Sequence, residues 1–218
     1  DIDADTFKFS DHMDSKAITR RGILSSVASV FDPLGFLTPF TLKGKLLIQD
    51  LCKEGKGWDE PISTEQEAKW KEWVGNISAF KEFNIRRCFL DPGTSYSNCE
   101  IQLHVFSDAS SYAYGMCAYI RIINRGSKQI SMILVMGKSR VGPKRAVTIP
   151  RLELQAATLG VKIGDFLIQE LKYPSLSLYY WTDSKTVLGY ISNDAKKFHT
   201  YVSNRVQRIR DSSSPQQW

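Results

Sequence analysis

The spacing of apolar residues predicts a helical first part of the chain. Apolar positions recur every three or four residues, which is the period of a helix with one buried face. This spacing predicts one helix from about residue 19 to 31 and a second from about 39 to 52. The stretch 32–35 contains proline and glycine and ends the first helix. A third helix opens at Ser63, because Gln66 stands three residues later, as in a capping box.

Two further features complete the first part. Residues 6–9 alternate between polar and apolar side chains and predict one edge strand. The third helix carries Trp70, Trp73 and Ile77 on one face. We interpret that face as a packing surface between helices, since large aromatic side chains contribute most when they are buried.

The pattern changes after a polar stretch at residues 91–99, which we predict to be a linker. Strict alternation begins with Ile101, Leu103 and Val105 and predicts a strand. Strands at residues 114–123 and 130–136 follow after short polar turns, which implies two antiparallel hairpins.

The remaining elements alternate between helix and strand. Thr148-Ile149-Pro150 begins a long apolar helix, since proline is favoured in the first turn. A strand at 176–181, a short helix at 185–191 and a basic helix at 198–210 follow. The order β-β-β-α-β-α-α predicts a mixed sheet in which the first strand is central. The fourth strand would lie beside it in parallel, reached by a right-handed crossover.

Three carboxylates occupy special places in this order. Asp108 ends the first strand of the sheet, Asp183 ends the fourth, and Glu153 lies one turn inside the crossing helix. The topology therefore predicts that they converge. Close carboxylates repel unless a cation lies among them, and Mg²⁺ prefers such oxygens. We predict a metal site for two-metal phosphodiester hydrolysis. The alternative for a single aspartate, Asp183 before Ser184 in particular, is a turn or a helix cap.

Composition agrees with this prediction and argues against a membrane or secreted protein. The chain has 218 residues, of which 42% are hydrophobic, and a formal net charge of +6. This permits a proper core and a polyanionic partner. No apolar run reaches the roughly 20 residues of a membrane helix. The acidic N-terminus lacks a signal peptide and an initiator methionine, so we expect a segment cut from a longer polypeptide.

The cysteines and histidines add little chemistry. The four cysteines form no Cys-x-x-Cys pair, so we expect a reduced, intracellular protein without a zinc site. His104 lies inside a strand and is predicted to pack there. No spacing demands a catalytic role for His199.

Basic residues gather around the second part of the chain. One group surrounds the loop into the Glu153 helix and another lies around the last helix, and both could contact duplex phosphates or simply face solvent. The predicted nucleic-acid-binding residues are Lys138, Arg140, Lys144, Arg145, Arg151, Lys196, Lys197 and Arg205, with Arg208 and Arg210 close by.

Several stretches together resemble one known family. They are residues 20–42, Gly57-Trp58-Asp59-Glu60-Pro61, Phe106-Ser107-Asp108-Ala109-Ser110, Lys138-Ser139-Arg140-Val141, Ile149-Pro150-Arg151-Leu152-Glu153-Leu154 and Trp181-Thr182-Asp183-Ser184. These motifs are similar to the reverse-transcriptase region of Bel/Pao-type LTR retrotransposon Pol polyproteins. The resemblance covers almost the whole chain.

The resemblance implies a domain plan and a fold. Residues 1–17 would be the tail of the polymerase palm, 18–90 a helical thumb or connection domain, 91–99 a linker, and 100–218 a ribonuclease H-like domain. The implied fold class is α/β, with a ribonuclease H-like mixed sheet after a small helical domain. The fourth acid and the fifth strand of that fold are expected beyond Trp218.

The resemblance also implies a function. It is cleavage of the RNA strand of RNA–DNA hybrids with Mg²⁺ or Mn²⁺, and Asp108, Glu153 and Asp183 match the first three acids. The implied partners are the hybrid, or other duplex nucleic acid, and the rest of the Pol polyprotein, including palm and integrase. The implied location is the cytoplasm, in a virus-like particle with access to the nucleus, and no membrane is involved.

Two other hypotheses remain. One is a non-catalytic nucleic-acid-binding piece, such as a domesticated remnant of the same fold. The other is a peptidase, because the family is often labelled a retrotransposon peptidase. The chain has no Asp-Thr-Gly or Asp-Ser-Gly loop, which an aspartic peptidase needs for its paired aspartates.

Overall fold

The computed structural model describes residues 1–218 except 10–15, 91–94, 146, 174, 194 and 196. It divides into two compact units, residues 1–91 and 92–218. None of the helices within the described ranges is both long and apolar enough to span a bilayer.

The first unit is mainly helical, as the periodicity predicts. A two-stranded antiparallel sheet pairs the predicted edge strand with a second short strand that the sequence pattern does not indicate. The elements of this unit are β1 (Thr6–Lys8), α1 (Arg20–Ser29), α2 (Thr38–Lys53), α3 (Thr64–Gly75), the 3₁₀ helix η1 (Asn76–Glu82) and β2 (Asn84–Arg86).

Aromatic side chains form much of the core of this unit. Trp70, Trp73 and Ile77 are all buried, which confirms the predicted packing face. The ring of Trp73 stacks on that of Phe40 with 4.3 Å between centroids. Its indole N–H also donates to the Phe40 carbonyl at 2.9 Å, so the buried polar group of Trp73 is satisfied.

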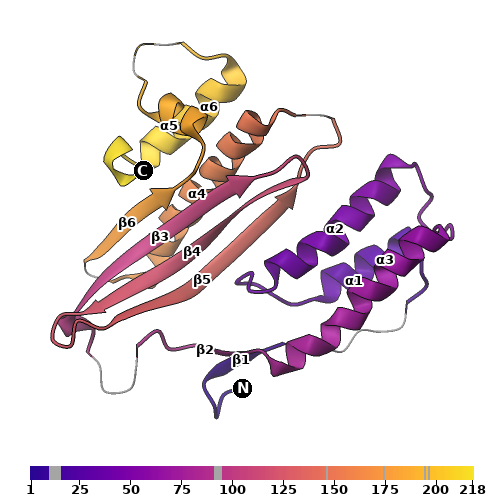
Figure 1. Ribbon diagram of the computed structural model, residues 1–218, viewed down its shortest axis with the longest axis horizontal. Helices are drawn as coiled ribbons and strands as arrows, with labels where there is room; N and C mark the ends of the chain where they lie inside the picture. Colours follow the sequence, from indigo (N-terminus) through magenta and orange to yellow (C-terminus); the bar gives the residue numbers. More distant parts are fainter. Residues whose placement is uncertain (10–15, 91–94, 146, 174, 194, 196) are drawn as a thin grey trace. The chain divides into compact units, whose positions relative to one another are not determined.

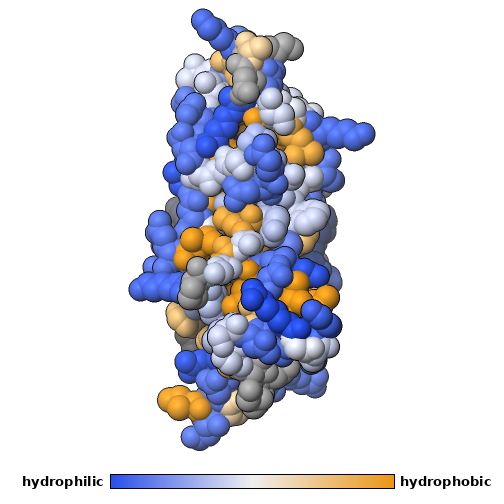
Figure 2. Space-filling model, turned by 90° about the vertical axis from the view of Figure 1, so that its left-hand side faces the viewer, coloured by the Kyte–Doolittle hydropathy of each residue, from blue (hydrophilic) through white to orange (hydrophobic). Residues whose placement is uncertain are grey.

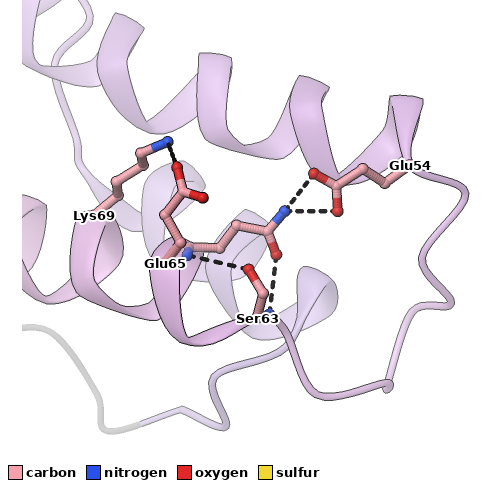
Figure 3. A network of polar contacts seen from close by, with 5 residues as sticks. Glu54, Ser63, Glu65 and Lys69 are labelled. Atoms are coloured by element: carbon pink, nitrogen blue, oxygen red, sulfur yellow. Dashed lines mark hydrogen bonds and ion pairs between the residues drawn. The ribbon is translucent and has the colours of Figure 1, made fainter.

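The start of α3 shows how local sequence closes a helix end (Figure 3). The Ser63 hydroxyl accepts from the Gln66 N–H at 3.3 Å, and the Gln66 amide oxygen accepts from the Ser63 N–H at 3.1 Å. This is the predicted capping box. The Gln66 amide group also donates to both carboxylate oxygens of Glu54 at 2.7 Å. Glu65 and Lys69, one turn apart, form an ion pair of 2.7 Å.

The second unit is built on a mixed sheet (Figure 1). The strand order is β5-β4-β3-β6, in which β3 pairs antiparallel with β4 and parallel with β6. The predicted topology is therefore confirmed. The elements are η2 (Tyr96–Asn98), β3 (Cys99–Ala109), β4 (Ala113–Asn124), β5 (Ile130–Val141), α4 (Ile149–Leu171), β6 (Leu176–Trp181), α5 (Lys185–Ile191), α6 (Thr200–Ser212) and η3 (Pro215–Gln217).

Helix α4 is the crossover between β5 and β6 and covers one face of the sheet, while α6 packs against α4 (Figure 1). Two glycines allow the close approach of α4 to the strands. A Cβ atom at Gly164 would lie 2.6 Å from the Tyr180 hydroxyl, and one at Gly160 would lie 3.3 Å from Val105. Alternate residues of β3, such as Leu103 and Val105, are buried on this side.

Two boundaries differ from the sequence expectation. Strand β5 continues to Val141 instead of ending near residue 136, because its whole length pairs with β4, up to the pair Ala113–Val141. Strand β3 begins at Cys99, inside the predicted linker 91–99. Residues 91–94 of that linker lie outside the described part of the chain.

Candidate functional site

Two of the three predicted acids leave the sheet at the same edge. The parallel register of β3 and β6 pairs Phe106 with Trp181. Asp108 and Asp183 each stand two residues further along, so both lie at the carboxyl ends of adjacent strands. The Ser107 hydroxyl donates to the Trp181 carbonyl at 3.2 Å and holds the two strand ends together.

The third acid, Glu153, reaches this edge from α4. One of its carboxylate oxygens accepts from the Ser184 hydroxyl at 2.5 Å. Ser184 directly follows Asp183 and is 6% exposed. Its hydroxyl also accepts from the Val187 N–H at 3.2 Å, which makes it the N-cap of α5. One buried serine therefore connects the Glu153 carboxylate, the end of β6 and the start of α5.

Among the residues that the structure describes, none of these three acids has a basic partner. Lys and Arg nitrogens within the described ranges all lie more than 4.0 Å from the carboxylates of Asp108, Glu153 and Asp183. The Asp108 carboxylate, which is exposed, accepts from the N–H of its neighbour Ala109 at 2.6 Å. Carboxylates without a positive neighbour favour a bound cation, which offsets their mutual repulsion.

The donor chemistry of this edge fits a hard divalent cation. Carboxylate oxygens are the protein ligands that Mg²⁺ prefers, and the ion keeps several waters, so it needs few protein ligands. In the part of the chain that the structure describes, no three His, Cys, Asp or Glu side chains are grouped closely enough to hold a metal. The acids share one edge without forming a closed set of ligands, and their assignment as ligands stays a prediction.

The predicted basic residues occupy several elements. Lys138 and Arg140 lie on β5 and not in the loop before α4, because that strand is longer than predicted. Lys144 and Arg145 lie in the loop, and Arg151 lies in the first turn of α4. The other members are Lys197 before α6 and Arg205 on α6, while Lys196 lies outside the described residues.

Two arginines near the last helix have structural partners. Arg208 forms an ion pair with Asp165 at 2.9 Å. Arg210 donates to the carbonyls of Tyr190, Ile191 and Asn193 and so closes the C-terminal end of α5. Both side chains therefore have a structural role in the packing of α6, which the sequence did not indicate.

The sheet face opposite α4 carries an aromatic network that the sequence did not reveal. Trp181 donates from its indole N–H to His104 Nδ1 at 3.0 Å, and Phe106 stacks on Trp181 with 5.8 Å between centroids. Burial, and after it the positive charge of Arg121, lowers the pKa of His104 below its usual value. Because an indole N–H can only donate, His104 Nδ1 is the acceptor in this hydrogen bond. The packing predicted for His104 is thus present, although the residue is only half-buried.

The residues that sequence reasoning missed are mainly partners of predicted ones. Ser184 was noted only as the residue after Asp183, although a serine at a helix start is a common cap. Tyr201 contacts Arg151 and Arg205 through its ring, and Gln155 donates to the Tyr201 hydroxyl, but neither residue carried a signal of its own. Hydrophilic residues predominate on the face drawn in Figure 2, and the apolar residues there form separate small groups.

Comparison with known proteins places the chain near nucleic-acid enzymes. The family model described as "Pao retrotransposon-like RNaseH-like domain" matches residues 19–184. No curated protein matches the chain.

Solved structures that match include three from different sources. RNase H1 from the halophilic archaeon Halobacterium salinarum NRC-1 is 12% identical, covering 50% of this chain and 75% of that one, with a TM-score of 0.31. The N-terminal RNase H domain of rv2228c from Mycobacterium tuberculosis, solved as a fusion with maltose-binding protein, is 10% identical. The match covers 51% of this chain and 73% of that one, with a TM-score of 0.31. A foamy viral protease-reverse transcriptase in complex with double-stranded DNA is 16% identical, covering 87% of this chain but 32% of its own length, with a TM-score of 0.37.

Proposed function

Because this chain belongs to the Pao retrotransposon-like RNaseH-like domain family, we propose that it hydrolyses the RNA strand of RNA–DNA hybrids. Asp108, Glu153 and Asp183 would hold the Mg²⁺ or Mn²⁺ ions that this reaction needs. The observation that carries the proposal is the arrangement of these acids. Asp108 and Asp183 end adjacent parallel strands, and Glu153 is bonded to the residue after Asp183.

Each residue has a distinct part in this proposal. Bound divalent ions of this kind activate an attacking water and stabilise the leaving oxygen. Asp108 and Asp183 would supply carboxylate oxygens from the sheet edge, and Glu153 would supply a third from α4. Ser184 orients the Glu153 carboxylate by its hydrogen bond. The basic residues around the edge would bind backbone phosphates and place the RNA strand against the acids.

The proposed partners follow from the same reasoning. They are the RNA–DNA hybrid and the remainder of a Pol polyprotein, with its polymerase palm and integrase. A second candidate function is non-catalytic binding of duplex nucleic acid. It is favoured by one observation, that the acids of the described residues are not gathered into a closed set of metal ligands.

A cleavage assay with a matched pair of variants tests the proposal. A labelled RNA–DNA hybrid is incubated with the chain in Mg²⁺ or Mn²⁺. Asp108→Asn should lower the cleavage rate by at least about a hundredfold. Even substitution of a residue that only supports a metal ligand lowers metal affinity or activity by roughly 10–100-fold. Glu100→Gln removes an exposed acid from the other end of the same strand and should leave the rate unchanged. A hybrid that is bound but never cleaved would support the second candidate instead.

A further inference from the structure

Helices α4 and α6 meet at one aromatic ring that carries two guanidinium groups. The ring belongs to Tyr201, and the guanidinium carbon of Arg205 lies 3.6 Å from its centroid. The guanidinium carbon of Arg151 lies 5.2 Å from the same centroid. The Gln155 side-chain amide donates to the Tyr201 hydroxyl and ties the ring to α4. We call Arg151, Tyr201 and Arg205 the arginine–tyrosine stack.

The spacing of these residues along the sequence places two of them on one face of α4 and two on one face of α6. Arg151 and Gln155 are four residues apart on α4, and Tyr201 and Arg205 are four residues apart on α6. Residues at this spacing lie above one another on a helix. Arg205 is further fixed because one of its guanidinium nitrogens donates to the Tyr201 carbonyl at 2.9 Å. The orientation of the Arg205 guanidinium is therefore set by both the ring and the helix backbone.

The two positive charges of the stack have no acidic partner in the described part of the chain. Within the described ranges, no Asp or Glu oxygen lies within 4.0 Å of the Arg151 or Arg205 guanidinium. Arg208, three residues after Arg205 on the same helix, is paired with Asp165. Two guanidinium groups on one ring repel each other, and an anion between them would remove that cost. Arg205 also retains most of its five N–H donors, since only one of its hydrogen bonds is made within the described chain.

We propose that the arginine–tyrosine stack binds a phosphate of the nucleic-acid backbone, which rests on the proposed function for the identity of the ligand. The planar guanidinium fork matches phosphate oxygens in a bidentate manner, and stacking on the ring leaves its edge free to donate. Arg151 stands two residues before Glu153 in the first turns of α4, and at 3.6 residues per turn the two side chains lie about 200° apart around the helix axis. The stack positions the duplex and takes no part in bond cleavage.

The salt dependence of hybrid binding tests this assignment. Affinity for a labelled RNA–DNA hybrid is measured in EDTA over a range of salt, so that no cleavage occurs. Each phosphate contact contributes about one unit to the slope of log affinity against log salt. Arg205→Gln and Arg151→Gln should each reduce that slope by about one and weaken binding about five- to tenfold at 0.1 M salt. Lys162→Gln removes one exposed charge further along α4 and should leave the slope unchanged.

Two further variants separate binding from packing. Arg205→Lys keeps the charge and should retain most of the slope. If the stack only docks α6 on α4, Arg205→Gln would lower the melting temperature and leave the slope as in the parent chain. That result would overturn the inference, as would equal slopes for Arg205→Gln and Lys162→Gln. Circular dichroism of each variant shows whether it is folded under the binding conditions.

Failure of this inference and failure of the proposed function are distinguishable. If the parent chain does not bind the hybrid at all, the proposed function itself fails. If the parent chain binds with a steep salt slope that both glutamine variants retain, only the stack assignment fails. Inorganic phosphate is the second probe. Thermal stabilisation by free phosphate that Arg205→Gln abolishes, with an unchanged hybrid slope, would assign the stack to a small anion and also overturn the inference.

Discussion

The two units of the molecule differ in how their charged side chains are paired. Among the residues that the structure describes, six ion pairs lie in the first unit and one, Arg208–Asp165, lies in the second. In the first unit, charges such as Glu65 and Lys69 are paired with close neighbours in sequence. In the second, the acids at the sheet edge and the arginines on the Tyr201 ring have no partner of opposite charge within the described ranges.

The difference indicates which unit is built to bind. An ion pair at the surface contributes little to stability, and each of its charges is already compensated by the other. Unpaired acids at one edge and unpaired arginines on one ring keep a free-energy cost that a cation and a phosphate would remove. The first unit is thus organised around its aromatic core, and the second carries the groups on which both proposals rest. The predictions below test this contrast, beginning with the largest effect.

Loss of the central tryptophan should damage the first unit alone. Trp73→Ala removes a 5% exposed ring that stacks on both Phe40 and Trp70. We expect a loss of about 3–5 kcal/mol in the unfolding free energy, as for other large-to-small core substitutions. Amide hydrogen exchange, followed separately for the residues of each unit, measures this loss of unfolding free energy. Trp58→Ala, at a 43% exposed tryptophan, is the control and should cost about 1 kcal/mol or less. An equal loss of protection in the sheet would show that the units unfold as one.

Removal of the serine that links the acids should affect both stability and chemistry in the second unit. Ser184→Ala deletes the N-cap of α5 and the hydrogen bond to Glu153. We expect a loss of about 1 kcal/mol from the cap and a decrease in metal-dependent cleavage of roughly tenfold from the freed carboxylate. Denaturant unfolding and the hybrid cleavage assay measure the two effects.

The matched substitution in the first unit should affect stability only. Ser63→Ala removes the cap of α3, whose hydroxyl serves the Gln66 N–H alone. Its cost should be similar, about 1 kcal/mol, because the cap geometry is of the same kind. Hybrid cleavage should stay at the parent rate. A decrease equal to that of Ser184→Ala would mean that cleavage follows stability and that Ser184 has no special relation to Glu153.

The smallest expected effect is a pH dependence of the unfolding free energy that arises from His104 in the sheet. The pKa of His104 lies below its ordinary value of 6.5 in the folded chain. As the pH falls, the unfolded chain therefore binds the proton first. The contribution to stability is complete above pH 6.5 and is lost below it. Urea unfolding between pH 5 and pH 8 should show a shallower pH dependence for His104→Gln than for the parent chain. The same dependence in both proteins would contradict the assignment to His104.

The sequence alone determined the features that depend on neighbours along the chain. The capping box of Ser63 and Gln66, the long helix with proline in its first turn and the alternating strand at Ile101 to Val105 follow from local spacing. The order of these elements was also enough for the strand topology, since short connections and the right-handed crossover leave few alternatives. The acids at the sheet edge follow from that topology.

Tertiary structure decided which polar groups meet across the fold. The bond from Ser184 to Glu153, the pairing of Arg208 with Asp165 and the stacking of Arg151 on Tyr201 join residues distant in sequence. The length of β5 follows from its pairing with β4. The partner of a charged side chain depends on which helix face packs against which neighbour. Spacing along the chain specifies the face, but only packing specifies the neighbour. For this reason the sequence listed all these basic residues as candidates for phosphate contacts, and only the fold showed that Arg208 and Arg210 have structural partners.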